Sequence, residues 1–358
     1  MHCDEKWMRR ALALAEQGRG RVHPNPMVGA VLVRGGRVIG EGCHRSFGQA
    51  HAEIEAIRRA CLPAGRRSTG ARGATLYVNL EPCSHWGKTP PCTEALIRAG
   101  VERVVAAMKD PNPAVSGRGF QKLKRAHVSV TSGVLEDEAR FLNRAFATWV
   151  TKKRPYITIK VASSLDGRTA TLTGDSKWIT GREARRVGHT FRAGVDAVAV
   201  GRSTVQADNP SLTAHGMGKN PVRVIFDSRL RSSLRAQVFS KAAPVWCLAT
   251  DHSTLKPMDL MKRRGVHVIL CKPDAEHRVS VPDAIKKLAA RGIAHLLVEG
   301  GLTLQKSFLK AGVVDEVVWF VAPMILGDAR RLKSAWRLKN LQVGMIGPDL
   351  CIRACLRE

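Results

Sequence analysis

Apolar residues recur with two different spacings along the first 110 positions. Between Asp4 and Gln17 they return every three or four residues, which predicts an amphipathic helix. Two apolar segments, 28–33 and 37–39, are separated by Gly35-Gly36 and predict a β-hairpin. Further helices are expected over 51–60 and 92–99, and further strands over 74–79 and 101–107. Alternating strands and helices are typical of an α/β layer.

A second series of alternating elements begins near residue 156. Strands are expected over 156–161, 195–200, 222–226, 245–249, 266–270, 295–298 and 317–321, and helices over 183–191, 281–291 and 302–310. The basic, proline-containing segment 151–155 separates the two series. We therefore predict two domains, residues 1–150 and residues 151–358.

The composition is that of a folded protein. An apolar content of 44% in 358 residues can fill ordinary cores and excludes general disorder. The longest apolar runs are shorter than the roughly 18–20 residues that a membrane span needs. Asp4 and Glu5 argue against a secretory signal, and the nine irregularly spaced cysteines do not resemble a disulfide framework. We expect a cytoplasmic protein without a membrane partner.

The formal net charge of +28 is spread along the whole chain, without a run of five or more like charges. A dispersed excess does not indicate a dedicated nucleic-acid face. We expect a small-molecule substrate and no nucleic-acid partner.

The first chemically informative group combines His51, Cys83 and Cys92 with Glu53. One imidazole and two thiolates are good zinc ligands, and three protein ligands leave a fourth tetrahedral position for water. Glu53, two residues from a ligand, can then move protons without binding the metal. Cys92 is expected at the start of a helix, where the thiolate is favoured. The pattern predicts a catalytic zinc site.

Two other interpretations of the same residues remain open. The histidine and the cysteines could be ordinary core residues, since free cysteines are often buried and inert. A structural zinc would need a fourth protein ligand, for which His44 and His85 are the candidates.

With its flanking motifs, this group resembles the zinc-dependent cytidine and nucleotide deaminases. Eight residues separate Cys83 from Cys92, whereas nucleic-acid deaminases usually have two. With the segments 24–29 and 110–113, the spacing resembles the RibD family of bifunctional riboflavin-biosynthesis enzymes. The resemblance implies a cytidine-deaminase-like α/β/α domain that deaminates a phosphoribosylamino-diaminopyrimidinone. It also implies substrate contacts from Asn25, His44, Lys88 and Asn112.

The second half contains several polar turns after predicted strands. Glu299-Gly300-Gly301 follows one strand and opens a helix, where backbone amides can approach a phosphate. A Gly-Gly pair is also common in simple tight turns. It is not the three-glycine dinucleotide fingerprint, so we exclude an ordinary Rossmann domain.

Short motifs across most of residues 155–327 are similar to the reductase half of the same family, whose fold resembles dihydrofolate reductase. The resemblance implies an NADPH site lined by Ala162, Trp178, Thr204, Asp208, Ser228 and the turn Gly301, Leu302, Thr303, Leu304, Gln305, Lys306 and Ser307. It further implies contacts to the ribose phosphate substrate from Ser176, Arg192, Leu212, His215 and Glu299.

One position departs from the family pattern. The family usually has an arginine where this chain has His215. Because a neutral imidazole cannot copy a bidentate arginine–phosphate contact, we expect weaker phosphate binding or compensation by Lys219 or Arg223.

These patterns predict a zinc- and NADPH-dependent bifunctional enzyme. Glu53 would move protons during deamination, and the second domain would reduce the ribosyl group to a ribityl chain. The resemblance also implies a homo-oligomer. The alternatives are a zinc deaminase acting on RNA, with a degenerate second domain, and a non-enzymatic protein with a structural zinc.

Overall fold

The computed structural model describes residues 2–61, 70–86, 90–170, 179–251, 255–324, 326 and 339–355. The chain divides into two compact units, Met1–Lys153 and Arg154–Glu358. Among the described residues, no helix combines the length and the apolar character needed to cross a membrane.

The first unit is built on a five-stranded sheet with the order β2-β1-β3-β4-β5. Its strands are β1 (Gly29–Arg34), β2 (Arg37–Cys43), β3 (Thr75–Val78), β4 (Arg103–Ala106) and β5 (Ser129–Ser132). β1 pairs antiparallel with both β2 and β3, whereas β3, β4 and β5 run parallel. The parallel strands therefore have their carboxyl ends at one edge of the sheet.

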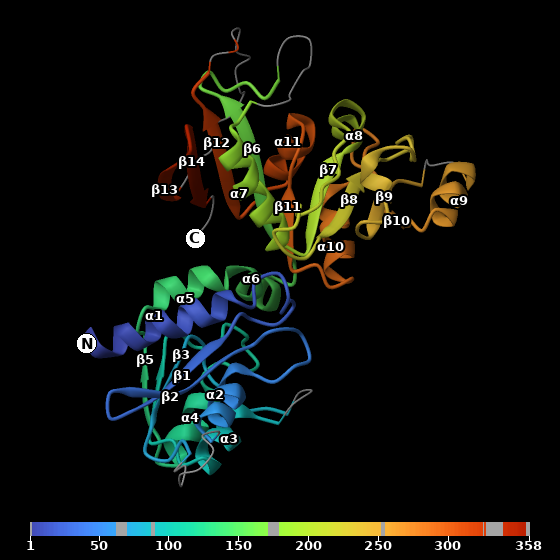
Figure 1. Ribbon diagram of the computed structural model, residues 1–358. Coiled ribbons are helices and arrows are strands. Elements are labelled where there is room, and N and C mark those ends of the chain that lie inside the picture. Colours follow the sequence, from blue (N-terminus) through green and yellow to red (C-terminus); the bar gives the residue numbers. More distant parts are fainter. Residues whose placement is uncertain are drawn as a thin grey trace. The chain divides into compact units, whose positions relative to one another are not determined.

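Helices cover both faces of this sheet, as Figure 1 shows. One face carries α1 (His2–Glu16), α5 (Glu136–Leu142) and α6 (Arg144–Lys152), and the other carries α2 (Ala52–Ala60), α3 (Cys92–Arg98) and α4 (Arg118–Arg125). α2 packs directly on β2. The two elements are so close that a Cβ at Gly42 would lie only 2.1 Å from the carbonyl oxygen of Ala52. Glycine at this position lets the start of α2 approach the sheet.

The second unit contains a nine-stranded sheet with the order β10-β9-β8-β7-β11-β6-β12-β14-β13. Its strands are β6 (Tyr156–Ser164), β7 (Ala197–Gly201), β8 (Val222–Phe226), β9 (Val245–Ala249), β10 (His267–Leu270), β11 (His295–Val298), β12 (Glu316–Ala322), β13 (Lys339–Ile346) and β14 (Asp349–Cys355). The strands from β10 to β12 are parallel, and the β13–β14 hairpin continues the sheet antiparallel.

Both faces of this sheet are buried. Ala197 and Ala199 of β7 belong to one core cluster and Val198 and Val200 to another, as the twofold alternation of a strand requires. The first cluster includes residues of α10 (Val281–Ala289) and α11 (Leu302–Lys310). The opposite face carries α7 (Arg182–Ala193), α8 (Arg202–Asp208), α9 (Leu255–Arg263) and the short 3₁₀ helix η1 (Gln237–Phe239).

The predicted α/β fold class is confirmed for both units, and most predicted elements are present. The additional elements are α4, β5, α5 and α6 in the first unit and α8, α9, β13 and β14 in the second. β6 extends three residues beyond its predicted end, to Ser164.

Candidate active sites

The three predicted zinc ligands lie together at one end of the first unit. His51 precedes α2 as its N-cap residue, Cys92 is the first residue of α3, and Cys83 lies in the loop after β3. The Nδ1 atom of His51 is 3.2 Å from the Cys92 sulfur and 3.6 Å from the Cys83 sulfur. All three donor atoms lie within 4.8 Å of one another.

These distances fit a tetrahedral zinc site. Ligand atoms of such a site lie about 3.5–3.8 Å apart, as follows from Zn–N and Zn–S bonds of about 2.0–2.3 Å. The donor set of one imidazole nitrogen and two thiol sulfurs also has the chemistry that zinc prefers. We conclude that His51, Cys83 and Cys92 can hold the zinc ion.

The environment of Cys83 favours its thiolate. Hydrogen bonds from the thiol of Cys92, from His51 and from the backbone N–H of Cys92 lower the pKa of Cys83, although burial opposes them. The backbone N–H of Cys92 belongs to the first turn of α3, so its donation to the Cys83 sulfur also draws on the positive end of that helix. The pKa of Cys92 is raised because the two thiols share one proton. Cys83 is thus the first of the pair to ionise.

Glu53 is buried, with only 3% of its surface exposed, and it lies in the first turn of α2. Burial raises the pKa of Glu53, while the nearby imidazole of His51 opposes this rise. A raised pKa makes the carboxylate of Glu53 a better proton acceptor than an exposed glutamate. Its position beside the ligands suits the transfer of protons near the metal.

His44 has both ring nitrogens engaged. Its Nδ1 atom is 3.1 Å from the carbonyl oxygen of Ala50, and its Nε2 atom is 3.2 Å from the side-chain amide nitrogen of Asn25. A neutral ring that donates from Nδ1 and accepts at Nε2 satisfies both contacts. Burial also lowers the pKa of His44, which favours the neutral form.

A fourth protein ligand is absent from the metal cluster that the described residues form. His44 packs edge-on against His51 with 5.6 Å between ring centroids, and His85 is exposed on the loop after Cys83. This arrangement favours a three-ligand site over the structural-zinc interpretation.

A cavity of about 320 Å³ opens beside this cluster. Predicted site residues that line it are His51, Glu53, Cys83, Asn25, His44 and Asn112. Asp110 also lines it and was missed at the level of sequence, although it begins the motif that contains Asn112. Burial raises the pKa of Asp110 to about 6, and its Oδ1 atom accepts a hydrogen bond from the backbone N–H of Asn112.

Glu81 holds the loop on one side of this cavity. Its buried carboxylate accepts hydrogen bonds from the backbone N–H groups of Asp110, Gly117, Gly119 and Phe120 at 2.8–3.3 Å. Because these donors lie on both sides of the segment 111–116, a single side chain fixes the position of Asp110 and Asn112. Glu81 is therefore a positioning residue.

Two buried asparagines fix the opposite wall. Asn143 exchanges hydrogen bonds with the backbone N–H and C=O of Met27, at 2.8 and 3.0 Å. Asn79 donates to the same carbonyl at 2.9 Å and accepts from the backbone N–H of Gly29 at 2.8 Å. The chain around Met27 is thereby held in place and presents Asn25 to the cavity.

In the second unit, Arg192 and Glu299 form a buried ion pair. The guanidinium of Arg192 on α7 donates two hydrogen bonds, of 2.8 and 2.9 Å, to the carboxylate of Glu299 at the end of β11. Burial alone would raise the pKa of Glu299, but the charges of Arg192 and Lys160 lower it to about 2. Glu299 is therefore an anion at neutral pH.

Lys160 is a residue that sequence reasoning missed. Val298 of β11 pairs with Ile159 of the parallel strand β6. The next residues, Glu299 and Lys160, therefore lie side by side. The Lys160 ammonium also lies 5.5 Å from the ring centroid of Phe320. Burial lowers the pKa of Lys160, and the charge of Glu299 opposes this shift. A lysine within an otherwise apolar strand was the available signal.

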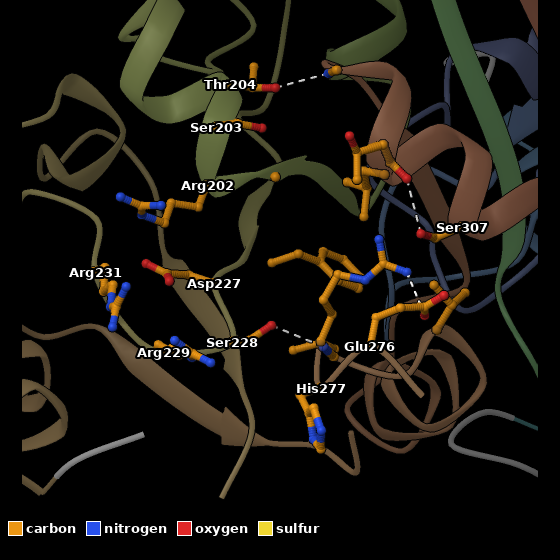
Figure 2. A pocket seen from close by; sticks show the side chains of 18 residues that line it. Arg202, Ser203, Thr204, Asp227, Ser228, Arg229, Arg231, Glu276, His277 and Ser307 are labelled. Atoms are coloured by element: carbon orange, nitrogen blue, oxygen red, sulfur yellow. Dashed lines mark hydrogen bonds and ion pairs between the residues drawn. The ribbon is translucent and has the colours of Figure 1, made fainter. Parts of the chain in front are cut away.

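A second cavity, of about 340 Å³, lies at the carboxyl ends of β7 and β8 and at the start of α11. Figure 2 shows its lining residues. Open α/β sheets bind ligands at this edge of the sheet. Six of the predicted cofactor-binding residues line the cavity: Thr204, Ser228, Gly301, Thr303, Leu304 and Ser307.

The donor set of this cavity fits a phosphate-bearing dinucleotide. The first turn of the nine-residue helix α11 presents backbone N–H groups, which favour an anion. Arg202 is the first residue of α8, directly after β7, and Arg229 and Arg231 come from the turn after β8. All three lie along the left of the cavity in Figure 2. The carboxylate of Asp227 is used within its own turn, where it accepts the backbone N–H of Ser232 at 2.7 Å.

The other predicted cofactor residues that the structure describes do not line this cavity. Gln305 is buried and donates to the carbonyl oxygens of Gly300 and Lys160, so its amide supports the turn from within. Of the described residues, Ala162, Asp208, Leu302 and Lys306 are not part of this cavity's lining. Lys88, Trp178 and Ser176 lie outside the described residues.

The loop that follows α8 carries the predicted substrate residues Leu212 and His215. Leu212 is buried in the core cluster of the α8 and α9 face, whereas His215 is exposed. Arg223 is fully buried and donates hydrogen bonds to the carbonyl oxygens of Ser240 and Ala243. The proposed compensation by Arg223 is therefore wrong, because its guanidinium is committed to the interior. Lys219 is exposed on the same loop.

Comparisons with known proteins agree with this geometry. The family model described as "RibD C-terminal domain" matches residues 155–352, and the model described as "Cytidine and deoxycytidylate deaminase zinc-binding region" matches residues 1–108. The second match includes His51, Glu53, Cys83 and Cys92.

Relatives match the chain over nearly its full length. The riboflavin biosynthesis protein RibD of Aquifex aeolicus is 43% identical, with 98% of this chain and 97% of that protein covered. The RibD of Bacillus amyloliquefaciens is 40% identical, with coverage of 99% and 97%. A Thermotoga maritima structure, described as a diaminohydroxyphosphoribosylaminopyrimidine deaminase/5-amino-6-(5-phosphoribosylamino)uracil reductase, is 39% identical and has a TM-score of 0.86, with 99% of each chain covered. The chain therefore belongs to the RibD family of riboflavin-biosynthesis proteins, with a zinc-binding deaminase domain followed by a reductase domain.

Proposed function

We propose that this chain catalyses two consecutive reactions on one small molecule. The first is hydrolytic deamination of a diaminohydroxyphosphoribosylaminopyrimidine, and the second is NADPH-dependent reduction of the ribosyl group of 5-amino-6-(5-phosphoribosylamino)uracil to a ribityl chain. The names of both substrates come from the similar Thermotoga maritima protein. The observation that carries the proposal is the His51, Cys83 and Cys92 cluster, with the buried Glu53 beside it.

In the deamination, water replaces the amino group and ammonia leaves. A zinc ion held by His51, Cys83 and Cys92 supplies a Lewis acid that makes water nucleophilic at neutral pH. Glu53 takes the proton from the attacking water and delivers it to the departing amine. Its raised pKa suits both halves of this transfer.

The walls of the deaminase cavity orient the pyrimidine. Asn25 offers amide groups, and its contact with His44 fixes which atoms face the ring. Asp110 and Asn112 offer a carboxyl and an amide from the opposite loop, held in place by Glu81. We assign Lys88 to the substrate phosphate on the family resemblance alone.

In the reduction, NADPH supplies the hydride, and the protein positions the two reactants. We place the cofactor along the cavity at the start of α11 and the ribose near Arg192 and Glu299. Lys160 is the partly buried cation closest in register to Glu299. Its ammonium can donate the proton that balances hydride addition at C1′ of the ribosylamine, where the bond to the ring oxygen breaks and the bond to nitrogen is kept. Lys160 is thus our candidate proton donor for the reduction, for which the sequence alone gave none.

We infer that Arg202, Arg229 and Arg231 recognise a phosphate of the cofactor. Their guanidinium groups line one cavity together with the exposed hydroxyl of Ser203. Arginine binds phosphate through planar, paired donors, which gives a preference for NADPH over NADH.

We further propose a homo-oligomeric, cytoplasmic enzyme without a nucleic-acid partner. The dispersed positive charge supports the last point. Light scattering on the purified chain tests the oligomer, and salt-dependent binding to single-stranded RNA tests the nucleic-acid partner.

Two variants separate the proposed reactions. Glu53→Gln removes the proton carrier of the first site and should stop ammonia release while leaving reduction of the deaminated substrate intact. Arg192→Ala breaks the ion pair of the second site and should impair only the reduction. An equal loss of both activities in either variant contradicts the assignment of the two sites.

A further inference from the structure

A short turn between β10 and α10 contributes charged side chains to the cavity at the start of α11. The turn spans residues 274–278, and Glu276, His277 and Arg278 line the cavity. Neither Glu276 nor Arg278 has a role in the reactions described above. A carboxylate in a cavity that accepts phosphate groups requires an explanation, because two negative charges placed side by side repel each other.

Asp274 builds this turn. Its Oδ1 atom accepts the backbone N–H groups of Glu276 and Arg278, at 3.0 and 2.8 Å. Its own backbone N–H donates to the carbonyl oxygen of Arg278 at 2.7 Å. Aspartate side chains commonly close turns through such bonds to the following backbone. A single carboxylate therefore fixes where the backbone of Glu276 and Arg278 lies on the cavity wall.

Ser228 joins the turn to the segment that follows β8. Its hydroxyl oxygen accepts the backbone N–H of Val279, the residue after Arg278, at 3.0 Å. Antiparallel pairing of Pro273 with Val279 closes the base of the turn. The turn is thus held at its base beside another segment that lines the same cavity.

The guanidinium of Arg278 is shared between two carboxylates. It donates to Glu276 at 2.8 Å, a contact that Figure 2 marks with a dashed line, and to Asp274 at 3.2 Å. The side chains of Arg278 and Glu276 are 44% and 59% exposed, and ion pairs this exposed contribute little to stability. A phosphate monoester carries nearly two negative charges and attracts a guanidinium more strongly than one carboxylate does. Arg278 can therefore exchange Glu276 for a phosphate while Asp274 keeps the turn in place.

We propose that the turn 274–278 reads the 2′ position of the cofactor ribose, with Arg278 bound to the 2′-phosphate of NADPH and Glu276 opposing that phosphate. This inference rests on the proposed function, in which NADPH occupies this cavity. The 2′ position carries a hydroxyl in NADH, which can donate to a carboxylate. In NADPH it carries a phosphate, which an arginine binds and a carboxylate repels. Glu276 therefore limits the preference for NADPH that the arginines of the cavity create.

Binding of NADPH and of NADH to the full, zinc-loaded chain tests this assignment. Fluorescence titration gives both dissociation constants for each variant. Arg278→Ala should weaken NADPH binding about 10- to 100-fold and change NADH binding by less than about twofold, because only NADPH carries the 2′-phosphate. Arg278→Lys keeps the charge but loses the planar pair of donors, so it should give an intermediate loss.

Glu276→Gln distinguishes an opposing carboxylate from a structural one. It should strengthen NADPH binding about three- to tenfold without strengthening NADH binding, since it removes the repulsion and releases Arg278. In the Arg278→Ala background the same substitution should strengthen NADPH binding less, because the two side chains act together. Asp259→Asn and Arg264→Ala change exposed charges outside the cavity and are the matched controls.

The inference is wrong if Arg278→Ala weakens NADPH and NADH binding equally, which would place Arg278 at the pyrophosphate that both cofactors share. It is also wrong if Arg278→Ala leaves NADPH binding unchanged, or if Glu276→Gln does not strengthen it. Oxidation of NADPH with the deaminated substrate is measured in parallel. Wild-type oxidation together with unchanged binding in the variants overturns this inference alone. Wild-type protein that neither binds nor oxidises NADPH contradicts the proposed reductase function, and this inference with it.

Discussion

The hydroxyl oxygen of Thr204 accepts a hydrogen bond of 2.9 Å from the backbone N–H of Gly301 (Figure 2). This contact joins the first turn of α8 to the residue that caps α11. Gly300, just before it, has φ +96°, and a Cβ there would lie 2.6 Å from the Thr204 hydroxyl oxygen. The turn at the start of α11 therefore depends on glycine at position 300 for both conformation and space.

Gly300→Ala should weaken NADPH binding strongly, because the added methyl group displaces Thr204 and strains the turn by about 1–3 kcal/mol. Fluorescence titration with NADPH measures this, and ammonia release should stay unchanged. Gly344→Ala is the control, since a Cβ there would meet nothing within 4 Å and Gly344 does not line the cavity. Similar affinities in the two variants would show that the turn does not depend on Gly300.

Glu53→Gln should reduce deamination by about 10²–10⁴-fold while zinc content stays at the wild-type level, because the substitution removes a proton carrier and no metal ligand. Elemental analysis and ammonia release provide the two readouts. Glu55→Gln, on the exposed side of the same helix, is the control. Deamination at the wild-type rate in Glu53→Gln would exclude the proposed role.

The double variant Arg202→Ala/Arg229→Ala should lose preference for NADPH over NADH by about 10- to 100-fold, since two phosphate-facing guanidinium groups are removed. The ratio of kcat/KM values for the two cofactors measures this. Lys310→Ala, at the far end of α11, controls for the loss of surface charge. An unchanged ratio would place the cofactor phosphate elsewhere.

Glu299→Gln should destabilise the second unit by about 3–5 kcal/mol at neutral pH, because it leaves Arg192 and Lys160 without their counterion. The pKa of Glu299 is lowered to about 2 in the folded protein, below its unfolded value of about 4.3. The stabilisation is therefore complete above pH 4.3 and is lost as the pH falls toward 2. Urea unfolding of both proteins should give a constant difference from pH 5 to pH 8 that shrinks below pH 4.3. A difference that is undiminished at pH 3 would contradict this.

Removal of zinc by a chelator should abolish ammonia release and leave NADPH oxidation with the deaminated substrate intact, because the three ligands all belong to the first unit. Restoring zinc should restore ammonia release. Equal loss of both activities would mean that the metal supports the reductase as well.

Regular hydrophobic periods made much of the fold predictable. The strands Val222–Phe226 and Val245–Ala249 and the helix Leu302–Lys310 have the bounds that their apolar patterns predict. The helix α8 was missed because Arg202–Asp208 has few apolar residues and ends at Asn209-Pro210, which favours a turn. The hairpin of β13 and β14 was missed because both strands alternate weakly.

The zinc cluster was predictable because its residue types and spacing are specific, and the structure brings them together. Whether a charged side chain is buried was harder to predict from the sequence. Arg223 was one of two candidates for a compensating phosphate contact, yet it lies in the interior and is hydrogen-bonded to backbone carbonyls, because its strand is buried on both faces. Lys160 shows the converse. A lysine in a largely apolar strand marks the position as unusual, but the sequence does not reveal that its ammonium is near the buried carboxylate of Glu299.

The most direct test of the central claim follows ammonia release and NADPH oxidation together, on zinc-loaded protein supplied with the diaminohydroxyphosphoribosylaminopyrimidine. The account predicts ammonia release that needs no NADPH, followed by oxidation of one equivalent of NADPH per ammonia. No ammonia release with zinc bound, or NADPH oxidation that precedes ammonia release, would contradict it.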